Sequence, residues 1–582
     1  MPPKAGGFAE DVTGSPPPVR QFRQILLWPL QLSPLGGRVR SGGHAGAFGA
    51  LPGNAWREAK PAVGDPARFR ESDYAEFVAF LPHVQRFLYG ESSRGRAGYG
   101  GSPIRVFERD DVAGAQVVLA PGDRPIALSV EHCALYFFYD IDVALFVLEV
   151  ASAELPLASV EDLSFRFARA YPASWTADGL GERCPVSVEW IGRGGGVLAR
   201  SDFEDRERYV KAVARTRAPC FALHWEWLLA PMVPDASEAP GPIRYRQLEY
   251  YRMPFMAYLA FDDPRALERE DFVRLGLATG PSRGHALPIG GPEIARFEEK
   301  SCYDRYWSPG DGAAPGTTRF LCTGHAFLLI GRNGDPYFTN AETGLLGQFR
   351  RQYFLLGLIA HFHKAALLML SDRLVLAISR LDIDDVESIK AFKRIIRRTS
   401  ETFLRFTHRY WFHEVSTQDQ SRDLFRLWTG HIDVDRLYDE VRTEIQDMSD
   451  YLDSDSIRRQ ANTVVRLTVV TTLGLIGTVA TGVLGMNVFA LADRPWTVKV
   501  LYFLVALGAT GLLTFFTVWR SKRLSGFLEA LAEEGNEPRE RWEALRAVWA
   551  RRPRNAAGTA GPAGAAGAAG SGGPETRGPV AP

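Results

Sequence analysis

The sequence has few cysteines and no excess charge of either sign, and each of these shortages excludes a class of protein. Five cysteines in 582 residues, with no Cys-x-x-Cys pair, exclude a disulfide scaffold and favour a reducing compartment. Basic and acidic residues number 68 each, so the chain is not expected to bind nucleic acid through a basic surface. A hydrophobic content of 46% with 12% aromatic residues excludes an acidic disordered protein.

Signals of secretion and catalysis are also missing. Residues 1–20 are rich in proline and glycine and have no apolar core, so they do not form a secretory signal. The glycine-rich stretch Gly192–Gly196 follows a strand-like run, but no Lys-Ser or Lys-Thr follows it, which favours a hairpin turn over a phosphate loop. No pairing of a nucleophile with a base stands out. We therefore expect neither an enzyme nor a bound cofactor.

Charge is absent over two long stretches near the C-terminus. Leu467–Ala492 gives 26 uncharged residues, and Val500–Trp519 gives 20 more. About 20 apolar residues cross the hydrocarbon core of a bilayer, so both stretches qualify as membrane spans. The next candidate, Phe354–Leu370, is interrupted by two histidines and a lysine, and we expect it to be a buried helix of a soluble domain.

The two spans are joined by only Asp493–Lys499, so they form a tight hairpin with both outer ends on one side of the membrane. Basic residues flank the hairpin on its outside: Arg458, Arg459, Arg466, Arg520, Lys522 and Arg523. The positive-inside rule therefore places both termini in the cytoplasm, in agreement with the free cysteines.

Composition divides the chain into segments. Glycine and proline are frequent before residue 345 and rare between there and the membrane, where helical periodicity is nearly unbroken and leads into the first span as one long helix. The predicted segments are a disordered N-terminus (1–20), an α/β domain (21–344) with a candidate insertion (172–316), a helical stalk (345–462), transmembrane helix 1 (463–492), an external loop (493–499), transmembrane helix 2 (500–519), a basic cytoplasmic helix (520–550) and a disordered Gly/Ala-rich tail (551–582).

Short runs rich in β-branched and aromatic residues predict strands within the α/β domain. They are Ile104–Phe107, Gln116–Leu119, Ile126–Val130 and Ala134–Asp140, with Val143–Val150 as a further strand or a buried helix. An Asn-Gly pair at Asn333 predicts a hairpin that joins Phe320–Ile330 to Tyr337–Thr339.

The first span carries small and hydroxyl residues on one helix face. This stripe repeats at spacings of three and four residues: Leu467, Thr471, Gly474, Thr478, Thr481 and Gly485. The second span is bulky and apolar throughout. An inner small and polar helix with an outer lipid-facing helix is typical of an oligomeric pore, whereas ordinary helix packing in membranes also favours Gly and Thr.

The first span ends in Gly485-Met486-Asn487, directly before the short loop. This motif at the external end of the penultimate span resembles the CorA-type magnesium channel family, and the resemblance covers roughly residues 345–523. Thr478 stands where the family has a pore-lining threonine, and Leu467-Thr468 matches the pair at the cytoplasmic mouth. Leu484 departs from the aromatic residue that often precedes the motif.

The resemblance implies a fold and a function. The chain is expected to form a homopentameric funnel in the bacterial inner membrane, with lipid and divalent cations as its partners. Gly485, Met486 and Asn487 would form the pore entrance, and the pore would be lined and gated by Leu467, Thr471, Leu475 and Thr478. Rings of neutral acceptors suit hydrated Mg²⁺, which gives up its water reluctantly.

Acidic clusters are candidates for a regulatory metal site. In the family, carboxylates between subunits bind Mg²⁺ and hold the channel shut. Here the candidates are Asp382, Asp384, Asp385, Asp447, Asp450 and Asp453. The alternatives are an N-terminal helix cap for the first three and a solvated helix face for the rest.

The leading hypothesis is a transporter of divalent cations, most favourably Mg²⁺, with Co²⁺ and Ni²⁺ as further candidates. One alternative is the zinc-transporting branch of the same family. The other is a non-conducting membrane-anchored sensor or scaffold, in which the enlarged soluble domain is the working part.

Overall fold

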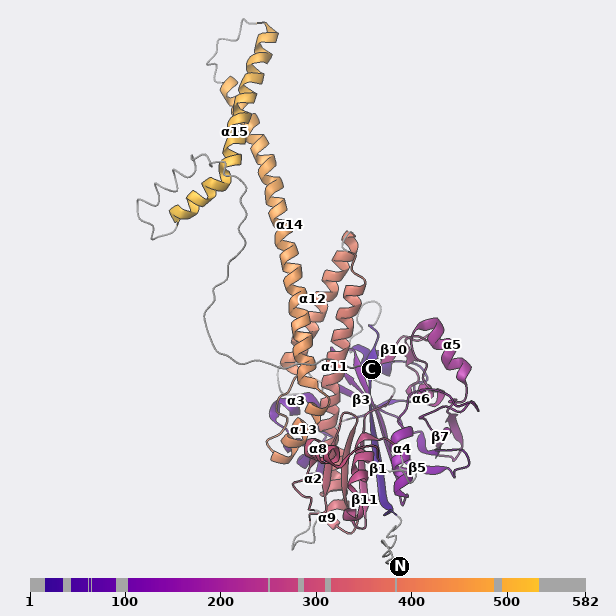
Figure 1. Ribbon diagram of the computed structural model, residues 1–582. Helices are drawn as coiled ribbons and strands as arrows, with labels where there is room; N and C mark the ends of the chain where they lie inside the picture. Colours follow the sequence, from indigo (N-terminus) through magenta and orange to yellow (C-terminus); the bar gives the residue numbers. More distant parts are fainter. Residues whose placement is uncertain are drawn as a thin grey trace, which may run out of the picture. The chain divides into compact units, whose positions relative to one another are not determined.

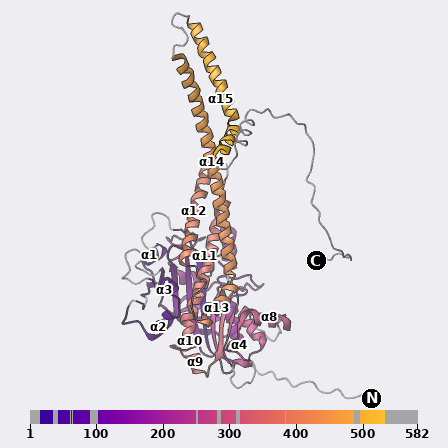
Figure 2. The same ribbon diagram turned by 90° about the vertical axis from the view of Figure 1, so that its left-hand side faces the viewer.

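The computed structural model describes residues 16–34, 43–60, 62–63, 65–90, 103–249, 252–280, 287–308, 316–382, 385–485 and 495–532. These residues divide into two compact units, one ending at Leu452 and the other beginning at Asp453. Figure 1 shows the sheet of the first unit among its helices, and Figure 2 shows the long C-terminal helices.

The strands of the first unit are β1 (Val19–Leu32), β2 (Arg57–Glu58), β3 (Ile104–Glu108), β4 (Val112–Val118), β5 (Ile126–Phe138), β6 (Val143–Ser152), β7 (Ser187–Gly192), β8 (Val197–Arg200), β9 (Val233–Pro234), β10 (Arg244–Gln247), β11 (Phe255–Phe261), β12 (Cys302–Tyr303), β13 (Arg319–Cys322) and β14 (Ala326–Arg332).

The helices of the chain are α1 (Gly43–Gly49), α2 (Glu71–Val78), α3 (Pro82–Tyr89), α4 (Leu157–Arg166), α5 (Arg206–Thr216), α6 (Leu223–Leu229), η1 (Pro264–Ala266), α7 (Arg269–Leu277), α8 (Gly291–Ser301), α9 (Pro336–Thr339), α10 (Leu345–Gln348), η2 (Phe349–Tyr353), α11 (Phe354–Ser379), α12 (Val386–Arg409), α13 (Asp419–His431), α14 (Val434–Gly485) and α15 (Trp496–Ala532).

All the described strands belong to one mixed sheet with the order β12-β13-β14-β11-β1-β6-β5-β4-β7-β8 along its main path. Most neighbours are antiparallel, but β11 and β14 run parallel, with Phe255 opposite Ala326. Every strand predicted from residue composition is present, and Val143–Val150 forms a strand rather than a helix. The prediction of an α/β domain is therefore confirmed.

Two hydrophobic cores cover the two faces of the sheet, because side chains alternate along each strand. On β6, Ala144, Phe146 and Leu148 enter one core. Val143, Leu145 and Val147 enter the other, which also holds the apolar side chains of α11, α12 and α13. β6 is therefore buried on both faces, which explains its continuous apolar sequence.

Three features differ from the sequence prediction. The candidate insertion (172–316) contributes β11, which lies between β1 and β14, so this segment is part of the sheet. The Asn-Gly pair does not join two strands, because Asp335 accepts a hydrogen bond from Tyr337 N (2.9 Å) and Pro336 begins α9. The hairpin is instead formed by β13 and β14.

The first part of the predicted stalk (345–462) also differs from the sequence prediction. Residues from 345 onward are helical, but α11 is buried against the sheet, where it packs on β1 and β6. From Phe354 to Leu370 apolar residues surround the helix, so this part has no solvent-facing side on which to form a free stalk. Near the end of α11, Val375, Leu376 and Ile378 are exposed. Phe354–Leu370 is accordingly a buried helix of the domain, as the sequence predicted.

Candidate functional site

The charge-free stretch that begins at Leu467 lies in the last part of α14. This helix is continuous from Val434 to Gly485, so the stretch forms one helix with the residues before it that we predicted to be stalk. Gly485 is its last residue, while Met486 and Asn487, the other two residues of the predicted pore entrance, lie outside the described residues.

The stripe of small and hydroxyl residues is exposed on α14. Leu467 is 63% exposed and Leu475 is 58% exposed, although both are apolar. The remaining members of the stripe are also exposed: Thr471, Gly474, Thr478, Thr481 and Gly485. An apolar and hydroxyl face that its own chain leaves uncovered is available for a pore or for neighbouring subunits.

The other side of α14 is covered. Ala480 is fully buried, and it lies nine residues from Thr471, which is half a turn away around an α-helix. α15 runs beside this part of α14 (Figure 2), and its Thr510 and Gly511 are half-buried. We infer that α15 packs on the side of α14 opposite to the stripe.

The threonine hydroxyls of the stripe donate their protons to the helix itself. Thr471 Oγ1 donates to the Leu467 carbonyl (2.9 Å), and Thr478 Oγ1 donates to the Gly474 carbonyl (2.9 Å). A hydroxyl that donates inward directs its lone pairs outward. The outer surface of these threonines therefore presents acceptors, which suits a cation or its water shell.

α15 carries the bulky face of the hairpin. Trp496–Phe516 is long and apolar enough to cross a membrane, and Leu504, Leu512 and Phe515 are exposed on it. Among the described residues one other helical segment, Leu345–Ser379, passes the same test, but it is mostly buried within the α/β domain. Trp496–Phe516 is therefore the better candidate for a membrane span.

The first acidic cluster is largely a helix cap. Asp385 precedes α12, and its carboxylate accepts hydrogen bonds from the backbone of Glu387 (3.0 Å) and Ser388 (3.1 Å). Asp382 is exposed, and Asp384 lies outside the described residues. The structure thus gives the carboxylate of Asp385 a capping role.

The second acidic cluster lies along α14. Asp447 and Asp450 are exposed, and the side chain of Asp453 is outside the described part. Within the described ranges of this single chain, no three His, Cys, Asp or Glu side chains come close enough to hold a metal ion.

The two histidines of α11 are core residues, as expected. Burial lowers the pKa of His361 to about 3 and the pKa of His363 to about 4. His363 Nε2 hydrogen-bonds to the carbonyl of Tyr410 (2.6 Å), and the His361 ring packs edge-on against Trp428. Both rings are therefore neutral parts of the packing at physiological pH.

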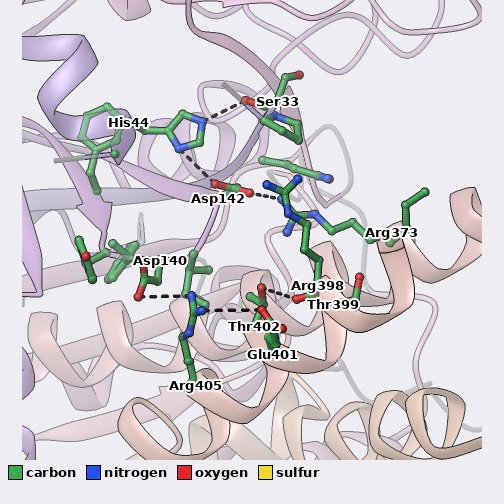
Figure 3. A pocket seen from close by; sticks show the side chains of 18 of the residues that line it. Ser33, His44, Asp140, Asp142, Arg373, Arg398, Thr399, Glu401, Thr402 and Arg405 are labelled. Atoms are coloured by element: carbon green, nitrogen blue, oxygen red, sulfur yellow. Dashed lines mark hydrogen bonds and ion pairs between the residues drawn. The ribbon is translucent and has the colours of Figure 1, made fainter. Parts of the chain in front are cut away.

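A cavity of about 870 Å³ lies where the strand ends of the first unit meet α11 and α12 (Figure 3). On one side, His44 Nδ1 contacts Asp142 (3.2 Å) while His44 Nε2 hydrogen-bonds to the Ser33 carbonyl (2.9 Å). Asp142 also forms an ion pair with Arg373 of α11. Although burial raises it, the pKa of Asp142 is lowered overall by these two partners.

The other side of the cavity is formed by α12. Arg405 pairs with Asp140 (3.6 Å), which comes from the turn after β5, and with Glu401 (4.0 Å) of its own helix. Arg398, Thr399 and Thr402 come from the same helix (Figure 3). The cavity therefore brings together residues that are more than 200 positions apart in the chain.

Sequence reasoning missed this cavity. The available signal is the density of arginine in α11 and α12, where Arg373, Arg380, Arg398 and Arg405 follow one another at irregular spacing. These arginines line one cavity only because the two helices lie near the end of β5 in the folded domain, and no local sequence pattern predicts that tertiary contact.

The comparisons with known proteins identify the C-terminal part. Residues 375–523 match the model of a family described as CorA-like Mg²⁺ transporter protein. A search of curated proteins finds no match to the chain. The matched region includes the end of α11, all of α12, α13 and α14, and most of α15, and its family is one of transporters and not of enzymes. Residues 375–523 of the chain are therefore similar to the CorA-like Mg²⁺ transporter family, and they include the candidate membrane span Trp496–Phe516.

Proposed function

We propose that this protein is a channel for divalent cations, most favourably Mg²⁺, in which α14 lines an axial pore at the centre of a homopentamer. The observation that carries the proposal is the exposed stripe of α14, which lies within the family-matched region and faces away from α15. In a pentamer the five stripes would face the axis and one another, while the bulky residues of α15 would face lipid.

The chemistry of the stripe supports a path for a hydrated ion. Neither charge-free stretch contains a carboxylate, so the path has no acidic cage that would strip water from the ion. Mg²⁺ keeps its inner water shell tightly, and neutral acceptors can bind that shell. Outward-facing lone pairs of Thr478 would supply one ring of acceptors, and Asn487 with the Gly485 carbonyl would supply the ring at the entrance.

Two leucines supply candidate gates. Leu467 and Leu475 lie on the same exposed face, about two helical turns apart. Five leucine side chains around an axis form an apolar constriction that closes by losing its water. We assign the cytoplasmic gate to Leu467 and a second constriction to Leu475.

Regulation by the transported ion is a further part of the proposal. Asp447 and Asp450 are exposed on α14, where carboxylates of neighbouring chains could share Mg²⁺. Asp382 is a second candidate, whereas Asp385 is already engaged as a helix cap. Asp384 and Asp453 complete the two proposed clusters.

We place the protein in a bacterial inner membrane with both termini in the cytoplasm. The basic residues flank the outside of the hairpin, and the loop between the spans is nearly neutral, so the α/β domain would lie on the cytoplasmic side.

Flux measurements on purified protein in liposomes test the proposal. Entry of Mg²⁺, Co²⁺, Ni²⁺ and Zn²⁺ is compared with isotopes or enclosed dyes. We expect Mg²⁺ to enter. A strong preference for Zn²⁺ would assign the chain to the zinc-transporting branch, and an assembled protein that passes none of the four ions would be a sensor or scaffold instead.

Two substitutions of Asn487 test its proposed role at the pore entrance. Asn487→Ala removes the whole ring of amide oxygens, so Mg²⁺ entry should fall at least tenfold while the oligomer persists. Asn487→Gly separates this role from helix capping, because glycine caps a helix end at least as well as asparagine. Normal Mg²⁺ entry through Asn487→Gly would contradict the role of Asn487 at the entrance.

A further inference from the structure

The cavity between β5, α11 and α12 carries more positive than negative charge. Six arginines line it: Arg105, Arg246, Arg373, Arg380, Arg398 and Arg405. Four carboxylates line it as well: Asp140, Asp142, Asp235 and Glu401. Counted over arginines and carboxylates alone, the lining therefore has two more positive charges than negative ones.

Four of these arginines are already paired with carboxylates. Arg373 contacts Asp142 and Arg405 contacts Asp140 within the cavity. Arg105 and Arg246 pair with carboxylates outside the lining, Glu58 (2.6 Å) and Asp372 respectively. These pairs fix the positions of the guanidinium groups and leave little of their charge uncompensated.

Arg380 and Arg398 differ from the other four. In the part of the chain that the structure describes, neither guanidinium group has an ion-pair or hydrogen-bond partner, although the carbonyl groups of both residues accept hydrogen bonds from nearby hydroxyls. Arg380 follows the last residue of α11 and Arg398 lies in the middle of α12, and both are exposed residues that line the cavity.

The wall of the cavity also has apolar parts. Leu376, Ala377 and Ile395 line it beside the arginines, and Leu376 is 39% exposed. A volume of about 870 Å³ is within the range of pockets that enclose a small organic molecule. The combination of guanidinium groups and apolar wall suits a molecule with an anionic end and a less polar body.

We propose that this cavity binds a phosphate-bearing small molecule of the nucleoside phosphate class. The guanidinium group presents a planar fork of donors that matches the oxygens of a phosphate, and it keeps its charge at every physiological pH. Arg380 and Arg398 hold the phosphates, and Leu376 and Ile395 contact the organic part. The hydroxyls of Thr399 and Thr402 lie on the same wall (Figure 3).

The cavity lies between two parts of the chain. One wall comes from the family-matched helices, while the other comes from strands and turns of the N-terminal part, which the family model does not match. The residues that we assign to the ligand, Arg380, Arg398, Leu376 and Ile395, all lie on the family-matched wall, and the N-terminal part closes the cavity opposite them. This ligand-binding role does not depend on whether the protein conducts ions.

Equilibrium binding to the full-length protein in detergent tests the proposal. Radiolabelled ATP is the probe, and EDTA removes divalent cations so that no metal bridges the nucleotide to the protein. We expect saturable binding that weakens as NaCl is raised, because salt screens the arginine charges. Inorganic phosphate should compete weakly and citrate, a carboxylate anion of similar charge, should not compete at low concentration.

The variant Arg380→Gln/Arg398→Gln removes the two unpaired charges without breaking an ion pair. We expect its affinity for ATP to fall at least about tenfold, with an unchanged unfolding temperature. Arg397→Gln is the matched control, because Arg397 is exposed on α12 next to Arg398 but does not line the cavity. Absence of ATP binding, equal losses in the control, or full competition by citrate would overturn the proposal.

Discussion

At the scale of single residues, the contact between Gly357 and Trp428 decides how closely α11 and α13 approach. A Cβ added at Gly357 would overlap the indole ring of Trp428. That ring has little room to move, since it is 2% exposed and stacks on Phe327 with 4.7 Å between ring centroids. Glycine in the first turn of α11 is therefore explained by packing, although alanine is the better helix former.

Gly357→Ala should destabilise the α/β domain. Overpacking of a rigid core costs about 1–3 kcal/mol, which exceeds the gain of up to about 1 kcal/mol in helix propensity. The unfolding temperature of the solubilised protein, followed by tryptophan fluorescence, should fall by several degrees. Gly430→Ala in α13 is the control, because no atom lies within 4 Å of a Cβ at that position, and an equal fall in both variants would contradict the packing argument.

The buried histidines of α11 should make the domain sensitive to acid. Their pKa values are lowered in the folded state, to about 3 for His361 and about 4 for His363, from an ordinary value of 6.5. Below pH 6.5 the unfolded chain takes up protons that the folded chain does not, so stability falls as the pH falls toward 4. At pH 5 each histidine should cost roughly 2 kcal/mol relative to pH 7.

Urea unfolding at pH 7 and pH 5 measures this effect. His361→Gln should reduce the pH dependence of the unfolding free energy by up to roughly 1.4 kcal/mol per pH unit, whatever it does to the stability itself. His408→Gln is the control, because it removes a histidine from an exposed position of α12 and leaves the core around α11 untouched. An identical slope in wild type and His361→Gln would show that His361 does not take part.

At the scale of elements, the exposed stripe of α14 predicts where a leak can be opened. Leu467→Ser should wet the proposed apolar constriction and raise the flux of cations through the closed channel severalfold. Flux is measured in liposomes under conditions in which the wild type is closed. Leu512→Ser on α15 is the control, because Leu512 is exposed on the bulky helix, and a Leu467→Ser protein that assembles with an unchanged leak would contradict the gate.

Sequence patterns predicted a helix or strand correctly where one local property, such as alternation of apolar residues, determines the structure. Alternating and apolar runs gave β3, β4, β5 and β6 because burial on one or both faces leaves a direct signature. They failed at α9, where the cap at Asp335 and the proline after it outweigh the Asn-Gly signal. They also gave no hint that β11 pairs in parallel with β14, since that contact joins segments about 70 residues apart.

One part of the candidate site could likewise be predicted from the sequence, and another part could not. The stripe of α14 follows from residue spacing alone, and its members are exposed in the single chain. The arginine cavity could not be predicted, because Arg398 and Asp142, which both line it, come from distant segments that only the tertiary fold brings to one place. The residue types of a helix predict which of its faces is buried. They do not predict which residues of a distant segment will pack against that helix.

At the scale of the whole molecule, topology is the property that reporter fusions can test. A fusion after the C-terminus should report a cytoplasmic location, and one within residues 488–496 should report a periplasmic location, because the basic flanks lie outside the hairpin. Alkaline phosphatase and green fluorescent protein give opposite signals on the two sides of the membrane. A periplasmic signal from the C-terminal fusion would refute the proposed orientation.

The central place of β1 has a consequence for synthesis of the chain. One edge of β1 pairs with β6, but the other edge pairs with β10 and β11, which follow β6 by roughly 100 residues. At about 5–20 residues per second, a ribosome needs on the order of 5–20 s to supply them. During that interval the nascent chain exposes an apolar strand with unpaired backbone groups, which is a template for aggregation. Until β10 and β11 have been synthesised, this edge of β1 is therefore the part of the domain at which the nascent chain is open to aggregation.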